Sequence, residues 1–183
     1  MKYTAVVFLG ISCVWTLQAQ DAGALVKDLQ QSYMGIKGNL MAAAEAMPES
    51  DYDFKLTPAQ RTFGGWVAHV AEAQTRTCGG IAGSSTKSDA GSKTSKADLV
   101  AALKASFDEC DTAYNGTTTE NYLSGVRSFR GETPRAAVLY GNIGHDQECY
   151  GNMVAYLRNK GIVPPSTKRM EEMMKHRGQQ GSK

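Results

Sequence analysis

Two residues in the C-terminal third of the chain, His145 and Cys149, are four positions apart and could bind a metal together. Side chains at this spacing point the same way from a helix. Imidazole nitrogen and thiolate sulfur are good ligands for zinc-like metals. With His69 as a ligand from a neighbouring helix, a fourth coordination position would stay open for water or substrate, as catalytic metals require.

This spacing alone does not establish a metal site, because H-x-x-x-C occurs often by chance. On the alternative interpretation, both histidines are hydrogen-bonded core residues and Cys149 is a small buried hydrophobic residue. A cysteine–histidine nucleophilic site is a further alternative, since His145 could lower the pKa of the thiol one turn away. We favour the metal site over that one, because no oxyanion hole or orienting partner is recognisable in the sequence.

Several polar residues could support these candidates. Asn142 and Asn152 lie three residues outside the pair and extend a polar stripe along the same segment. Glu148 and Glu72 are candidates for carboxylates that orient a histidine. Asp146 could act in the same way, but we interpret it as part of a solvent-exposed helix face.

The elements that must position these residues are predicted to be helices. Apolar residues recur at helical spacing in four segments, near residues 22–47, 58–78, 96–114 and 134–160. Thr57-Pro58 and Thr133-Pro134 each place an N-cap threonine before a proline at the first helical position. No strand-type alternation is visible. The predicted fold class is therefore an all-α four-helix bundle.

Residues 79–95 are rich in Gly, Ser, Thr and Lys and predict a long flexible crossover between the second and third helices. A connection of this length can join two parallel helices. Cys78 and Cys110 lie in the C-terminal parts of those helices, so parallel packing would bring them together in a disulfide. The alternative is that both are unpaired core cysteines.

Residues 1–20 are predicted to be a signal peptide, because Lys2 precedes an apolar stretch, Ala5 to Trp15, that is too short to span a bilayer. An uncleaved membrane anchor is the alternative. We expect the mature protein to be exported, periplasmic or secreted, without a membrane association once the signal is cleaved. Oxidising conditions there favour the disulfide.

The chain has 183 residues, which is enough for one domain with a core. We assign that domain to residues 21–166 and a polar, basic tail to residues 167–183. The formal net charge of +2 argues against nucleic acid as the main partner, because phosphate binding needs a concentrated basic surface.

The segment HDQECYGNMVAYLRNKGIVPPS, residues 145–166, resembles the last helix of the DinB-like family, whose members often carry H-D-x-E-H-Y-G followed by Y-L-R and G-I-V-P-P. The resemblance extends over about residues 22–166 and is strongest here and around His69. It implies a four-helix bundle in which one histidine of the second helix and two of the last hold a divalent metal. His69 and His145 match two of those positions, and Cys149 occupies the third.

The resemblance further implies a metal-dependent enzyme, with zinc or a nickel-like ion activating a thiol or water, and the predicted signal peptide makes it an exported one. Thiol-dependent transferases and hydrolase-like enzymes are the activities implied, with a small molecule or a thiol as substrate and a homodimer as one expected assembly. The alternative is a non-catalytic helical bundle that binds a small ligand or a partner, its metal site lost through Cys149. The metal content of the protein would distinguish the two.

Overall fold

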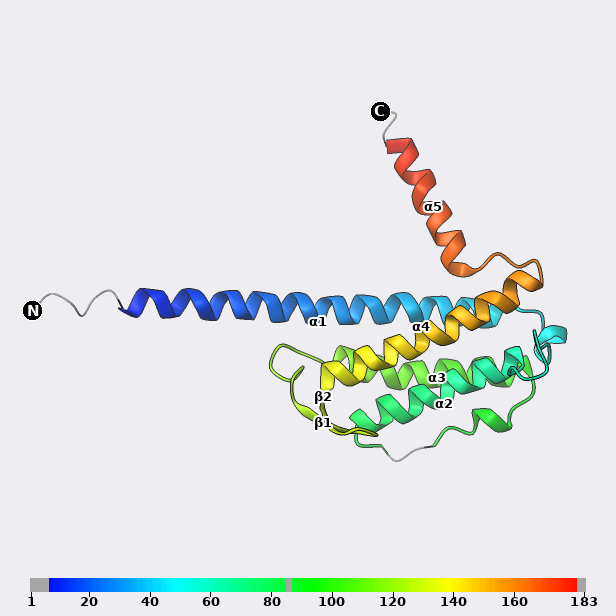
Figure 1. Ribbon diagram of the computed structural model, residues 1–183, viewed down its shortest axis with the longest axis horizontal. Helices are drawn as coiled ribbons and strands as arrows, with labels where there is room; N and C mark the ends of the chain where they lie inside the picture. Colours follow the sequence, from blue (N-terminus) through cyan, green and yellow to red (C-terminus); the bar gives the residue numbers. More distant parts are fainter. Residues whose placement is uncertain (1–6, 85–86, 181–183) are drawn as a thin grey trace, which may run out of the picture.

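The computed structural model describes residues 7–84 and 87–180, with side chains described for residues 22–84 and 87–179. In this part of the chain, four α-helices form a bundle: α1 (Val7–Ala46), α2 (Phe63–Ile81), α3 (Lys96–Asn115) and α4 (Arg135–Asn159). A further helix, α5 (Pro165–Gln180), follows them. The predicted all-α class is confirmed, with a small hairpin added to it (Figure 1).

Helices α1 and α4 run in one direction, and α2 and α3 in the other (Figure 1). The parallel packing predicted for α2 and α3 is found: Gly64 lies against Leu99 at their N-terminal ends. At their C-terminal ends the Cα atoms of Cys78 and Cys110 are 5.0 Å apart, at disulfide distance. Antiparallel packing of α2 against α4 sets the middle of one helix beside the middle of the other, which is where the candidate ligands lie.

The bundle core is built from large side chains of all four helices. Tyr33 of α1 stacks on Tyr114 of α3 with ring centroids 3.8 Å apart. The hydroxyl of Tyr33 donates to Asp111, and that of Tyr114 donates to the backbone of Leu139 in α4. These contacts join three helices at the level of the candidate site.

The second helix begins later than predicted. Its N-cap is Thr62, whose hydroxyl accepts a hydrogen bond from Gly65 N, and not Thr57. The reason is tertiary: the backbone of Tyr52 and Phe54 accepts hydrogen bonds from Gly64 and Phe63, which fixes where the chain enters the helix. The segment between α1 and α2 contains a short 3-10 helix, η1 (Glu49–Asp51), and a turn around Pro58.

The last bundle helix also differs at its start. Thr133 was expected to cap it, but lies in a strand, β2 (Gly131–Pro134), which pairs antiparallel with β1 (Gly125–Ser128). Pro134 is the N-cap and makes no side-chain capping bond. This hairpin leaves no visible strand pattern in the sequence, because four-residue strands are too short to show a clear alternation.

The connection between α2 and α3 is shorter than predicted. Helix α2 continues to Ile81, and a 3-10 helix, η2 (Ala90–Ser92), interrupts the crossover with Ala90 buried. By contrast, α3 starts as predicted: the hydroxyl of Ser95 accepts a hydrogen bond from Asp98 N.

The two ends of the chain differ from the expected boundaries. Helix α1 starts at Val7, before the predicted residue 22. Residues 1–6 of the predicted signal peptide lie outside the described residues, and its function stays a prediction. Among the residues that the structure describes, no helix has both the length and the apolar character needed to cross a membrane.

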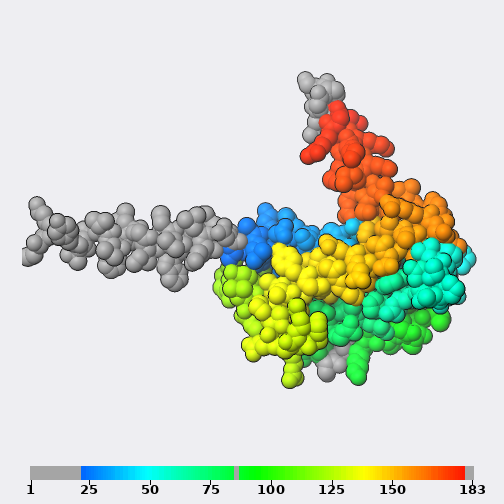
Figure 2. Space-filling model, viewed as in Figure 1, coloured from blue at the N-terminus to red at the C-terminus, as the bar shows by residue number. Residues whose placement is uncertain are grey.

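The predicted tail is mostly helical, since α5 runs from Pro165 to Gln180. Figure 2 shows α5, coloured orange to red, standing away from the bundle. It is tied to the body near its start, where Arg169 donates a hydrogen bond to Asn39 of α1 and Ser166 bonds the hydroxyl of Tyr150.

Candidate metal centre

The structure brings His69, His145 and Cys149 together between α2 and α4. The Nε2 atoms of the two histidines are 3.0 Å apart, and Cys149 Sγ lies 3.6 Å from His145 Nε2. The candidate ligand atoms of all three residues lie within 4.8 Å of one another. This is the convergence that the spacing and the family resemblance predicted.

Two of the three distances between the candidate ligand atoms are close to those around a tetrahedral zinc ion. Zinc bonds of about 2.0–2.1 Å to nitrogen and about 2.3 Å to sulfur place two nitrogens about 3.3 Å apart and nitrogen about 3.5 Å from sulfur. The observed 3.0 Å and 3.6 Å are close to these values. The third pair, Cys149 and His69, lies within 4.8 Å and would have to shorten for all three side chains to bind one ion. The donor set, two imidazoles and one thiol, is also one that zinc accepts.

The three side chains differ in their exposure to solvent. Cys149 is 2% exposed and faces the core, while the side chain of His145 is 32% exposed and His69 is half-buried. The ring of Trp66 packs edge-on against His69, with centroids 6.0 Å apart. The thiol therefore lies on the inner side of the cluster, and the imidazoles form the side that solvent and small molecules can reach.

The carboxyl group of Asp146 lies beneath this cluster, fully buried at 0% exposed. The expectation that it belongs to a solvated helix face is wrong, because α4 turns this side toward α2. Gln74 Nε2 donates a 2.6 Å hydrogen bond to Asp146 Oδ2. The other oxygen, Oδ1, has no hydrogen-bond partner among the described residues and lies 3.8 Å from His145 Nδ1.

The two histidines have pKa values shifted in opposite directions. Asp146 and then Cys149 raise the pKa of His145 to about 10, although burial of the ring opposes the shift. Burial, followed by the charges of Arg61 and His145, lowers the pKa of His69. These shifts favour His145 as the donor and His69 as the acceptor of their contact in the metal-free protein, and a cation bound by both nitrogens would take the place of that proton.

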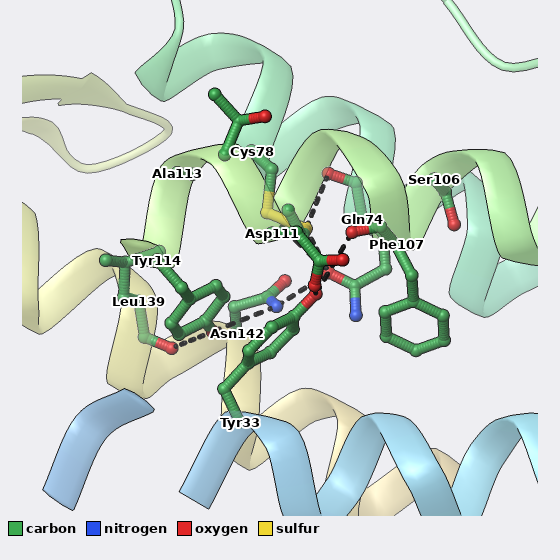
Figure 3. Close-up of a disulfide and its surroundings, with 12 residues drawn as sticks. Tyr33, Gln74, Cys78, Ser106, Phe107, Asp111, Ala113, Tyr114, Leu139 and Asn142 are labelled. Carbon is green, nitrogen blue, oxygen red and sulfur yellow. Dashed lines mark hydrogen bonds between the residues drawn. A yellow bond between two sulfur atoms is a disulfide. The ribbon is translucent and has the colours of Figure 1, made fainter. Parts of the chain in front are cut away.

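Gln74 connects Asp146 to a buried polar network. Figure 3 shows the part of this network that contains Gln74, Asn142 and Tyr114, beside the disulfide. Gln74 Oε1 accepts a 2.7 Å hydrogen bond from Asn142 Nδ2 and lies beside the sulfur of Cys110. Asn142 Nδ2 also lies 3.3 Å from the hydroxyl of Tyr114. Asn142, a predicted supporting residue, does not hydrogen-bond to His145 directly in the described part of the chain. It is connected to that histidine through Gln74 and Asp146.

The other predicted supporting residues do not join the cluster. Glu148 is exposed, and Asn152 donates to the backbone of Glu148 within its own helix. Glu72 accepts a hydrogen bond from Gly91 N and so holds the crossover instead of a histidine. Sequence reasoning missed Gln74; the available signal was an amide side chain within the apolar run VAHVAEAQ of α2.

The chain is similar to known proteins in both sequence and fold. A family model described as the DinB superfamily matches residues 37–151, more than half of the chain, and this range includes all three candidate ligands. No curated protein sequence matches the chain.

Two solved structures illustrate the similarity of fold. A DinB-like protein from Bacillus cereus is 17% identical with a TM-score of 0.64, and the match covers 76% of this chain and 95% of that one. A DinB-like protein from Bacillus subtilis is 15% identical with a TM-score of 0.59, covering 74% and 93% respectively. At these identities the likeness concerns the fold alone.

Proposed function

The chain belongs to the DinB superfamily, and we propose that it is an exported metal-dependent enzyme whose ligands are His69, His145 and Cys149. One observation carries this proposal: three metal-ligating atoms from two helices lie within 4.8 Å of one another. They fall inside the part of the chain that matches the family.

The residues present favour zinc among the divalent ions. Cys149 can act as a ligand only as the thiolate, and sulfur prefers zinc to harder ions. Its burial excludes competing water from the thiol. Asp146, held by Gln74, faces the Nδ1 side of His145 and so favours the ring orientation in which Nε2 points toward His69.

Three protein ligands leave one coordination position for a reactant. When bound, a divalent metal ion lowers the pKa of a thiol or water at that position, which is chemistry that thiol transferases and hydrolases share. His145, partly exposed, borders the accessible side of the cluster, so a small-molecule or thiol substrate can approach there. The buried side of the cluster keeps Cys149 away from solvent.

Export is supported by two features. The predicted signal peptide precedes the bundle, and Cys78 and Cys110 lie at disulfide distance. Disulfides form and persist mainly in oxidising compartments. A periplasmic or secreted location agrees with both.

Cobalt(II) substitution tests the open position. The Cys149→His variant is the best reporter, since it removes the protein's own thiolate and any sulfur-to-cobalt absorption band must come from an added thiol. If the enzyme activates a thiol, ethanethiol should produce such a band in cobalt-loaded Cys149→His. If it activates water, the zinc-loaded wild type should hydrolyse 4-nitrophenyl acetate faster than His145→Ala does. If neither response occurs, the chain is a non-catalytic bundle and the proposed function is wrong.

A further inference from the structure

A pocket of about 610 Å³ lies beside the candidate metal centre. Its walls come from α2, α4 and the β1–β2 hairpin, and His145 forms part of one wall. The volume is in the range of small-molecule sites, about 300–1,000 Å³. Because His145 belongs to both the pocket and the ligand cluster, a molecule in the pocket would lie next to the candidate metal.

Apart from His145, the ionic side chains that line this pocket are all arginines. Arg76 of α2 and Arg127 and Arg130 of the hairpin all line it, and no Asp or Glu does. None of the ion pairs found among the described residues involves these three arginines. Three guanidinium groups around one pocket, without carboxylates to neutralise them, favour an anionic ligand.

The pocket also has an apolar surface. Phe129, one of the two residues at the tip of the hairpin, is 98% exposed and lines the pocket together with Val138 and Ala73. The guanidinium of Arg130 lies 5.6 Å from the centre of the Phe129 ring. A ligand with an apolar or aromatic part could cover this ring while its anionic group meets the arginines.

We propose that this pocket binds a small molecule that combines a carboxylate or phosphate group with an apolar part. Arg76, Arg127 and Arg130 hold the anionic group, and Phe129 packs on the apolar part. The proposal that this molecule is the substrate rests on the proposed function. The proposal that the pocket binds it does not, because none of the four residues is a candidate metal ligand.

Calorimetric titration with phenyl phosphate, benzoate and the neutral analogue phenol tests the proposal. We expect one or both anions to bind at least tenfold more tightly than phenol, in both the zinc-loaded and the chelator-treated protein. Tighter binding of phenyl phosphate would identify a phosphate site, and tighter binding of benzoate a carboxylate site.

Matched variants connect the binding to the pocket. Arg76→Gln, Arg127→Gln and Arg130→Gln should each weaken anion binding about three- to tenfold, as expected for loss of a charged hydrogen bond near the surface. Arg158→Gln, an exposed arginine in the last turn of α4 and outside the pocket, should change nothing. Phe129→Ala should weaken phenyl phosphate but leave inorganic phosphate unaffected.

The proposal is overturned if neither anion binds more tightly than phenol, or if the three pocket variants weaken binding no more than Arg158→Gln does. Anion binding that persists in a protein unable to take up zinc would support this inference while contradicting the metal-dependent function. Zinc uptake without arginine-dependent anion binding would contradict this inference and leave the metal-dependent function supported.

Discussion

His69 Nε2 and His145 Nε2 lie 3.0 Å apart, although the two residues are separated by 76 positions in the sequence. Two basic nitrogens this close need a proton or a cation between them, because their lone pairs would otherwise face one another. The raised pKa of His145 and the lowered pKa of His69 favour a proton in that place, carried by His145, in the metal-free protein. Cys149 adds a third candidate ligand to this cluster.

Asp146 is expected to control the basicity of His145. Asp146→Asn removes the carboxylate that contributes most to the raised pKa of His145, so that pKa should fall from about 10 toward the ordinary value. Imidazole proton or nitrogen chemical shifts measured against pH in the chelator-treated protein would report it. An unchanged His145 titration in Asp146→Asn would show that the carboxylate does not act on the ring.

The same shift has a consequence for stability. A histidine whose folded pKa is raised stabilises the folded state below its unfolded pKa of about 6.5, and this contribution is lost as pH rises through about 10. Urea unfolding of the metal-free protein should therefore show a decrease in stability between these pH values. The decrease should be smaller in His145→Gln, and an equal decrease in both proteins would contradict the assignment.

Gln74 is expected to be the main structural support of the site. Gln74→Leu leaves Asp146 buried without its hydrogen bond, which should cost about 1–3 kcal/mol in the free energy of unfolding. The control is Gln147→Leu on the exposed face of α4, where a change within about 0.5 kcal/mol is expected. Urea titration measures both variants, and equal stability of the two would exclude a supporting role for Gln74.

The two threonines before α2 allow a direct test of where that helix begins. Thr62→Ala removes the observed N-cap bond to Gly65 N and should destabilise the protein by about 1 kcal/mol. Thr57→Ala, at the exposed position that the sequence suggested, should have little effect. A larger loss for Thr57→Ala would restore the helix start that the sequence predicted.

Removal of the disulfide between α2 and α3 should lower the free energy of unfolding. Cys78 and Cys110 are 32 residues apart, and a disulfide closing such a loop stabilises by about 3–4 kcal/mol in the chain-entropy model. Thermal unfolding of the double variant Cys78→Ala/Cys110→Ala against wild type measures this. Non-reducing peptide mapping that finds both cysteines as free thiols would contradict the pairing itself.

Helix starts that depend on neighbouring residues in the chain could be predicted from the sequence, and those that depend on the folded structure could not. The start of α3 was predictable because Ser95 and Asp98 cap it within one turn. The start of α2 was not, because Tyr52 and Phe54 position it through hydrogen bonds that depend on the folded loop. The hairpin was missed since its strands are only four residues long.

In the candidate site too, spacing along one helix could be read from the sequence, whereas contacts between helices could not. His145 and Cys149 could be paired from their spacing along one helix. His69 was a candidate third ligand, but its place beside His145 was supported only by the family resemblance, because the distance depends on how α2 and α4 pack. Asp146 was misassigned, and Gln74 missed, since burial of a polar side chain is decided by the neighbouring helix.

Zinc content tests the central claim most directly. Protein purified without chelator or affinity tag, offered zinc and then dialysed, should contain about one zinc ion per chain by elemental analysis, as should Cys149→His. Cys149→Ala and His145→Ala should lose most of it, because two remaining protein ligands bind zinc weakly. A wild-type protein that stays metal-free while Cys149→His takes up zinc would contradict the account and identify a bundle whose metal site was lost at Cys149.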